Sequence, residues 1–182
     1  MAMTLIISFS QGNPHDKNKV KIDNGICFGL CIWLIETAKS LDNPEFLQYV
    51  SKFALKPGKI METGLTYQKQ SNQGRNDAIT GLIFNIDIAS GSENIGETMT
   101  SAYDLLDTAA ITNSIYILSF FGKKWGHATV LFKKGGQCYW FDPNFGLYSI
   151  DPIDTIGELM GFLKKMYPDI SKAKLNYLAI TQ

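Results

Sequence analysis

Few side chains in this sequence are suited to nucleophilic chemistry. Its 182 residues include two histidines, His15 and His127, and three cysteines, Cys27, Cys31 and Cys138. A cysteine thiolate is a nucleophile, and a histidine beside it serves as general base and acid near neutral pH. Nucleophilic or histidine-dependent chemistry of this kind must therefore use these five residues.

Cys27 is the better nucleophile of the two cysteines in the first apolar stretch. It follows Asp23-Asn24-Gly25, which favour a helix start, so we expect it in the first turn of a helix from Cys27 to about Ser40. Unpaired N–H groups and the helix dipole stabilise a thiolate there, and the effect has faded at Cys31, one turn further on. The alternative is that both cysteines are buried core residues, as free cysteines commonly are.

His127 is the candidate general acid and base. It begins the apolar strand expected from His127 to Phe132, where the alternative is a purely structural histidine. His15 lies in a polar loop between Pro14 and Asp16, and we expect it to be solvated.

Strand register predicts an acidic partner for His127. If Gly135-Gly136 form a two-residue hairpin loop, Thr129 faces Asp142 and His127 faces Asn144. Side chains alternate along strands, so these four residues share one face, with His127 and Asp142 about 7–8 Å apart at the backbone. An acid beside an imidazole fixes its tautomer and stabilises the imidazolium.

Two alternatives to that partnership stay open. A one-residue bulge at the glycine pair would move every side chain to the other face. Asp142-Pro143-Asn144 also reads as a turn in which Asp142 caps its own backbone.

The elements expected to position these residues divide into a helical first half and a sheet-rich second half. Helices are predicted from Cys27 to about Ser40, from Asn43-Pro44 to Pro57-Gly58, from Glu97 to Ala110 and from Pro152 to Tyr167. Strands are predicted over Leu5–Phe9, Leu82–Ile88, Ser114–Phe121, His127–Phe132, Gln137–Phe141, Leu147–Ile150 and Leu175–Ile180.

This order predicts the fold class and the division of the chain. Segregated helices and an antiparallel sheet are typical of an α+β fold. We expect one domain over residues 1–182, with a helical lobe over about 20–112 and a sheet lobe over about 113–182. Residues 58–77 are polar and contain Gly64 and Gly74, which predicts a long loop.

Composition excludes several classes of protein. The chain is 45% apolar and 19% charged, which is typical of a globular protein, and its 17 basic and 17 acidic side chains give no net charge. We therefore expect no nucleic-acid partner. The apolar run Ile26–Ile35 is too short to span a bilayer, and Met1–Phe9 lacks the basic start of an ordinary signal peptide. Without a CxxC pair, a zinc site gains no support and a reducing compartment is the simpler expectation.

Three motifs in the order Cys, His, Asp carry a family resemblance. A cysteine that starts a central helix, with histidine and aspartate on adjacent strands, is the architecture of papain-like cysteine hydrolases. Residues Gly25 to Leu34 (GICFGLCIWL) resemble the cysteine motif of the YopT/AvrPphB cysteine proteases, which are bacterial effectors. Gly126-His127-Ala128 resembles their histidine motif, and Tyr139 to Gly146 (YWFDPNFG) their aspartate motif.

The resemblance implies a function and the residues that perform it. It implies a papain-like fold and a thiol protease without metal or organic cofactor, with Cys27, His127 and Asp142 as the catalytic triad. The oxyanion would be held by the N–H of Cys27 and by an amide side chain, for which Asn24 and Gln11 are the candidates.

The resemblance also implies a setting. The protein would be a virulence effector or toxin domain that cleaves host proteins, and targets of this family include Rho-type GTPases and kinases. It would be secreted into the host cytoplasm by a type III-like route or form part of a larger toxin. We expect a monomer that is not an integral membrane protein.

Three other functions stay open at this point. An NlpC-type peptidoglycan endopeptidase shares the order of cysteine and histidine, although such domains usually carry Asp-Cys-Ser-Gly where this chain has Ile26-Cys27-Phe28-Gly29. A deamidase or transglutaminase uses the same triad and releases ammonia without chain cleavage. An inactive binding module is the alternative outside enzymes, and an unreactive Cys27 would favour it.

Overall fold

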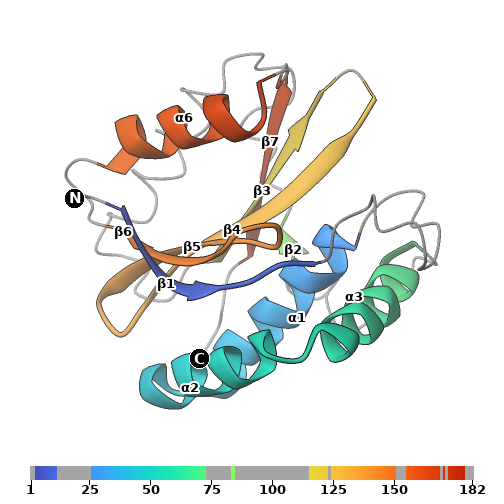
Figure 1. The fold of residues 1–182 in the computed structure, drawn as a ribbon, viewed down its shortest axis with the longest axis vertical. Coiled ribbons are helices and arrows are strands. Elements are labelled where there is room, and N and C mark those ends of the chain that lie inside the picture. The colour runs from blue at the N-terminus through green and yellow to red at the C-terminus, as the bar shows by residue number, and fades with distance from the viewer. Residues whose placement is uncertain are drawn as a thin grey trace.

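A single antiparallel sheet organises the chain. The computed structural model describes residues 3–11, 26–72, 83–84, 115–122, 124–150, 155–168, 170 and 172–178. Seven strands lie in the order β1-β6-β5-β4-β3-β7-β2 (Figure 1). Their bounds are β1 Met3–Ser8, β2 Ile83–Phe84, β3 Ile115–Phe121, β4 Gly126–Lys134, β5 Gln137–Asp142, β6 Gly146–Ile150 and β7 Lys172–Leu178.

Helices cover both faces of the sheet. The described helices are α1 Cys27–Ser40, α2 Asn43–Ala54, α3 Pro57–Asn72 and α6 Thr155–Met166. Figure 1 shows α1, α2 and α3 on one side of the sheet and α6 on the other. Because strand side chains alternate, β4 supplies Val130 to the core under α1 and Leu131 to the core under α6. The α+β class predicted from the sequence is confirmed.

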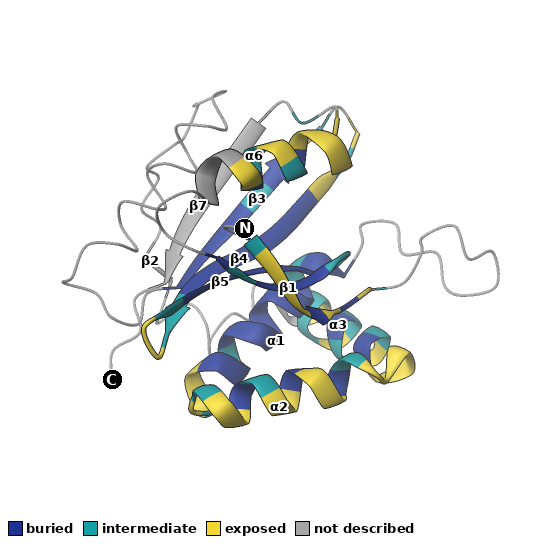
Figure 2. Cartoon of the chain, turned by 60° about the vertical axis from the view of Figure 1, so that its left-hand side comes forward, coloured by how far each residue is buried: buried dark blue, intermediate teal, exposed yellow. Residues whose placement is uncertain are grey.

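Helix α1 is buried on nearly all sides, as its uniformly apolar sequence predicts (Figure 2). It begins at Cys27 after Ile26, which provides no side-chain cap, and its first backbone bond runs from Leu30 N–H to the Ile26 carbonyl at 2.9 Å. At the other end, Lys134 Nζ of β4 donates to the Ala38 carbonyl at 2.7 Å. The helix is therefore tied to the sheet where its carbonyls lack partners. Residues 23–25, which predicted its start, lie outside the described residues.

Helix α2 begins where the sequence predicts. Asp42 is its N-cap and accepts a hydrogen bond from Glu45 N–H at 3.1 Å, with a proline in the first turn. Its buried residues Phe46, Val50 and Phe53 follow a helical spacing on one face.

The long loop predicted over residues 58–77 is wrong for residues up to Asn72, because α3 occupies Pro57–Asn72. Proline starts a helix readily, since the first N–H needs no partner. The polar composition concealed a narrow buried face formed by Ile60 and Gly64. Gly64 is a close contact and not a helix breaker, because a Cβ there would lie 2.6 Å from Ile26 Cδ1 of the neighbouring chain segment.

The hairpin register predicted for β4 and β5 is confirmed. Lys134 pairs with Gln137, and the ladder continues to Val130 opposite Phe141. The turn requires left-handed backbone at both glycines, with φ of 57° at Gly135 and 78° at Gly136, so Gly-Gly suits a type I′ turn.

Most of the remaining predicted strands and the last helix are also present, with boundaries shifted by a few residues. Only Ile83–Phe84 of the strand predicted over Leu82–Ile88 lies among the described residues, where it pairs with β7. The helix predicted over Glu97–Ala110 lies outside the described residues. The division into a helical and a sheet lobe stays a prediction, although β1 and β2 from the first half join the common sheet.

All three cysteines are free thiols and are buried. In the part of the chain that the structure describes, no helix is both long enough and apolar enough to cross a membrane.

Candidate active site

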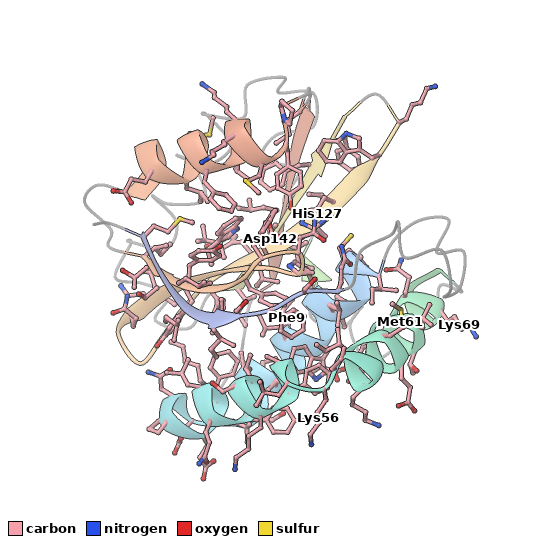
Figure 3. All side chains as sticks on the ribbon, viewed as in Figure 1. Phe9, Lys56, Met61, Lys69, His127 and Asp142 are labelled. Carbon is pink, nitrogen blue, oxygen red and sulfur yellow. The ribbon has the colours of Figure 1, made fainter. Side chains whose placement is uncertain are left out.

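The candidate residues meet at the end of the sheet where β4 begins and β5 ends. Cys27 is the first residue of α1, His127 the second of β4 and Asp142 the last of β5. His127 pairs with Phe120 of β3, which belongs to the core under α6, so strand alternation places the imidazole toward that layer. Cys27 approaches from the opposite helix layer. Figure 3 shows His127 and Asp142 between α6 and α1.

A short hydrogen bond joins the imidazole to the carboxylate. His127 Nε2 lies 2.8 Å from Asp142 Oδ1, and the two residues are 6% and 0% exposed. Burial alone would lower the pKa of His127, but the Asp142 charge and hydrogen bond, with Cys27, raise it to about 9. This shift favours the imidazolium form of His127 at neutral pH.

The same carboxylate also caps its turn. Asp142 Oδ1 accepts from the Asn144 N–H at 2.8 Å, as the turn interpretation of the sequence predicts. The turn and the imidazole contact are thus compatible, because one carboxylate oxygen accepts both donors.

Cys27 is hydrogen-bonded to His127 and to backbone donors. Burial raises the pKa of the Cys27 thiol, but the hydrogen bond and charge of His127 and the backbone hydrogen bonds of Ala128 and Phe28 bring it below its ordinary value of 9.0. Since Asp142 engages Nε2, Nδ1 is the ring nitrogen left for the thiol. The three residues form a hydrogen-bonded row that favours a thiolate–imidazolium pair.

Cys31 has the opposite environment although it lies one turn away on the same helix. It is fully buried, and burial together with the charges of Cys27 and Asp142 raises the pKa of its thiol well above 9.0. It is a core residue, as is Cys138, which packs in the core under α6.

Tyr167, which directly follows α6, contacts both His127 and Asp142. Its hydroxyl donates to Asp142 Oδ2 at 2.9 Å, and its ring stacks on the imidazole with centroids 5.1 Å apart. Asn144 Nδ2 in turn donates to the Tyr167 hydroxyl at 2.9 Å.

Of the two residues predicted to hold the oxyanion, Gln11 lies among the described residues and Asn24 does not. Gln11 Nε2 donates to Asn144 Oδ1, and its own N–H donates to the Pro143 carbonyl at 2.7 Å. Gln11 is therefore part of the hydrogen-bond network that reaches Asp142 through Asn144 and Tyr167. Asn24 lies outside the described residues, as does the loop histidine, His15.

Sequence reasoning missed two residues around the site. The sequence predicts Tyr167 only as the end of a helix, because helical backbone is disfavoured at the residue before Pro168. Gln68 Oε1 of α3 accepts from the Gly29 N–H at 3.0 Å, in the first turn of α1. The sequence contains no signal for a contact between Gln68 and α1, because the polar composition of residues 58–77 predicts a loop.

No group of three or more His, Cys, Asp or Glu residues that would hold a metal ion occurs among the described residues. The arrangement supplies a buried thiol with a lowered pKa, an imidazole with a raised pKa and a buried carboxylate that orients the imidazole. These are the components of cysteine-dependent acyl transfer.

Two solved structures have a similar fold. The Pseudomonas avirulence protein AvrPphB superposes with a TM-score of 0.57 at 16% identity, over 96% of this chain and 97% of that chain. PatoxP, a cysteine protease-like domain of the Photorhabdus asymbiotica toxin PaTox, superposes with a TM-score of 0.51 at 15% identity. That match covers 87% of this chain and 49% of the other. No family profile and no curated protein matches the sequence. The expected likeness to the AvrPphB type and the papain-like fold is confirmed as a likeness of fold.

Proposed function

We propose that this chain is a cysteine endopeptidase that cleaves proteins by acyl transfer. The observation that carries the proposal is the hydrogen-bonded row from Cys27 through His127 to Asp142 at the N-terminus of a buried helix. The fold of the solved neighbours, an avirulence protein and a cysteine protease-like toxin domain, supports the same reaction class.

The first half of the reaction forms a thioester. Cys27 Sγ attacks the peptide carbonyl carbon, and the carbonyl electrons move onto the oxygen to give a tetrahedral oxyanion. When the intermediate collapses, the C–N bond breaks and His127 gives its proton to the leaving amine. Asp142 holds the imidazole and stabilises its charged form without taking the proton.

The second half restores the enzyme. Neutral His127 removes a proton from water, the hydroxide attacks the thioester, and the C–S bond breaks to release the acid and the thiolate. The N–H of Cys27 lies in the first turn, where no intrahelical acceptor serves it, so it is the natural first oxyanion donor. For the second donor, Asn24 and Gln11 remain the candidates, and Gln11 would have to use the Nε2 hydrogen that does not bind Asn144.

The proposal also covers where the protein acts and on which class of substrate. The chain acts on host proteins as an effector delivered into the host cytoplasm or as a domain of a larger toxin. The 49% coverage of the PaTox structure favours a module that also occurs inside larger toxins.

The test compares newly formed protein N-termini in a eukaryotic cell lysate treated with wild type, Cys27→Ala or Cys31→Ala. We expect new termini with wild type and Cys31→Ala and none with Cys27→Ala. Cys31→Ala is the matched control because it removes a thiol from the same buried helix, one turn away.

Iodoacetamide labelling at pH 7 provides the companion measurement, and Cys27 should react while Cys31 stays unmodified. Absence of Cys27-dependent termini together with an unreactive Cys27 would contradict the protease and favour a binding module. Cys27-dependent ammonia release without new termini would indicate a deamidase or transglutaminase instead.

A further inference from the structure

Tyr167 contacts both His127 and Asp142, the two residues that lower the pKa of the Cys27 thiol or hold the imidazole that does so. Its hydroxyl reaches Asp142 Oδ2 at 2.9 Å while its ring stacks on His127, tilted by 29°. Asp142 is 0% exposed, so hydrogen-bond donors from the protein must stabilise its negative charge in place of water. With the His127 and Asn144 bonds on Oδ1, Tyr167 supplies the donor to the second oxygen.

The Asp142 carboxylate fixes which partner donates in each hydrogen bond of the network that leads to it through Tyr167. An ionised carboxylate only accepts, so Tyr167 must donate its single hydroxyl hydrogen to Asp142. Its oxygen then accepts from Asn144 Nδ2, which turns Asn144 Oδ1 toward Gln11 Nε2. The result is a chain of hydrogen bonds in which Gln11 donates to Asn144, Asn144 to Tyr167, and Tyr167 to Asp142. Burial and the charge of Asp142 raise the pKa of Tyr167, so its hydroxyl keeps that hydrogen.

The backbone holds Tyr167 in this place. Its N–H donates to the Leu163 carbonyl at 2.8 Å, which extends the hydrogen bonding of α6 by one residue. Leu159 and Leu163 of the same helix are each 1% exposed and anchor it in the core. Pro168 then disfavours further helix after Tyr167. The Tyr167 ring also contacts the Trp125 ring, with the two centroids 5.6 Å apart.

We propose that Tyr167 is a positioning residue: its hydroxyl holds the Asp142 carboxylate against His127, its ring covers the imidazole, and Asn144 and Gln11 orient the hydroxyl. This inference rests on the proposed function, because it takes the roles of His127 and Asp142 from it. Without the hydroxyl, the buried carboxylate loses one of its donors and its fixed orientation. The imidazolium then becomes less stable, and the turnover number falls while substrate binding is retained.

The test uses the fact that the chain has only two histidines. NMR of ring-labelled histidine follows both across pH in a Cys27→Ala background, where the thiolate no longer perturbs His127 and His15 serves as the internal reference. We expect Tyr167→Phe to lower the pKa of His127 by about one unit relative to the parent.

The matched control is Tyr139→Phe. It removes a hydroxyl bonded at 3.1 Å to Asn43 Oδ1, outside this network, and should leave the His127 titration unchanged. An unchanged or higher His127 pKa in Tyr167→Phe would overturn the inference. If that variant does not fold, Asn144→Ala tests the same chain of hydrogen bonds, and the His127 pKa should fall by a smaller amount; no fall would overturn the inference equally.

Kinetics of the same variants with Cys27 restored separate the two proposals. We expect Tyr167→Phe to lower kcat about tenfold with KM little changed, and Tyr139→Phe to change neither. A shifted His127 titration in a protein that cleaves nothing would contradict the proposed function alone. An unshifted titration in an active protease would contradict the role of Tyr167 alone.

Discussion

The two sides of the sheet hold the site by different means. On the α1 side, apolar burial and close backbone contact place the nucleophile: a Cβ on Gly29 would lie 2.2 Å from the Gly64 carbonyl oxygen of α3. On the α6 side, hydrogen bonds to one buried carboxylate place the imidazole. Packing is non-directional and shared among many residues, whereas hydrogen bonds concentrate in a few atoms. Substitutions at the close contact of Gly29 should therefore change stability and activity together, whereas substitutions of the residues hydrogen-bonded to Asp142 should change mainly activity.

The largest expected effect tests the hydrogen-bonded side. Asp142→Asn keeps the size of the side chain but removes the negative charge that stabilises the His127 imidazolium and replaces one of the two acceptor oxygens, which serve His127 and Tyr167, with an amide donor. We expect kcat toward a peptide substrate to fall about 10⁴-fold, with a thermal unfolding midpoint far less affected than the activity. A fall of less than about tenfold would show that His127 is oriented by other contacts.

An intermediate effect tests the packed side. Gly29→Ala puts a methyl group against the α3 backbone, 2.7 Å from the Gln68 nitrogen, so the two helices must separate and Gly29 N–H loses its bond to Gln68. Urea unfolding should show a loss of about 1–3 kcal/mol, accompanied by lower activity.

The matched glycine lies in the helix on the other side. Gly161 of α6 has nothing within 4 Å of an added Cβ, so Gly161→Ala should stabilise the protein by about 0.5–1 kcal/mol. If Gly29→Ala instead stabilised the protein, the explanation of the α1 side by close backbone contact would be refuted.

The smallest expected effect lies at the far end of α1. Lys134→Met removes the bond to the Ala38 carbonyl but keeps an apolar stem over Phe46. Urea unfolding should show a loss of about 0.5–1.5 kcal/mol, with kcat unchanged, because Cys27 is at the other end of the helix. The exposed lysine of α2, in Lys52→Met, should change neither quantity. A large loss of activity in Lys134→Met would mean that the whole helix shifts when one end is released.

Local sequence signals predicted the parts of the site with strong turn and strand chemistry. The glycine pair at 135–136 set the register that brings Asp142 beside His127, because side chains alternate strictly along strands. The apolar run after Cys27 predicted a buried helix for the same kind of reason. Where the pattern was weak, prediction failed: α3 has a narrow buried face and two glycines, so its composition resembled a loop.

The sequence by itself determined the residue types available for chemistry, the helix start at Cys27 and the pairing of the two strands that carry His127 and Asp142. These follow from short-range rules of backbone geometry and periodicity. Only the tertiary structure decided that Tyr167, 25 residues after Asp142, supports the carboxylate, and that Gln68 binds the first turn of α1. Such contacts depend on how separate helices pack across a sheet, and periodicity within one segment contains no information about the partner segment.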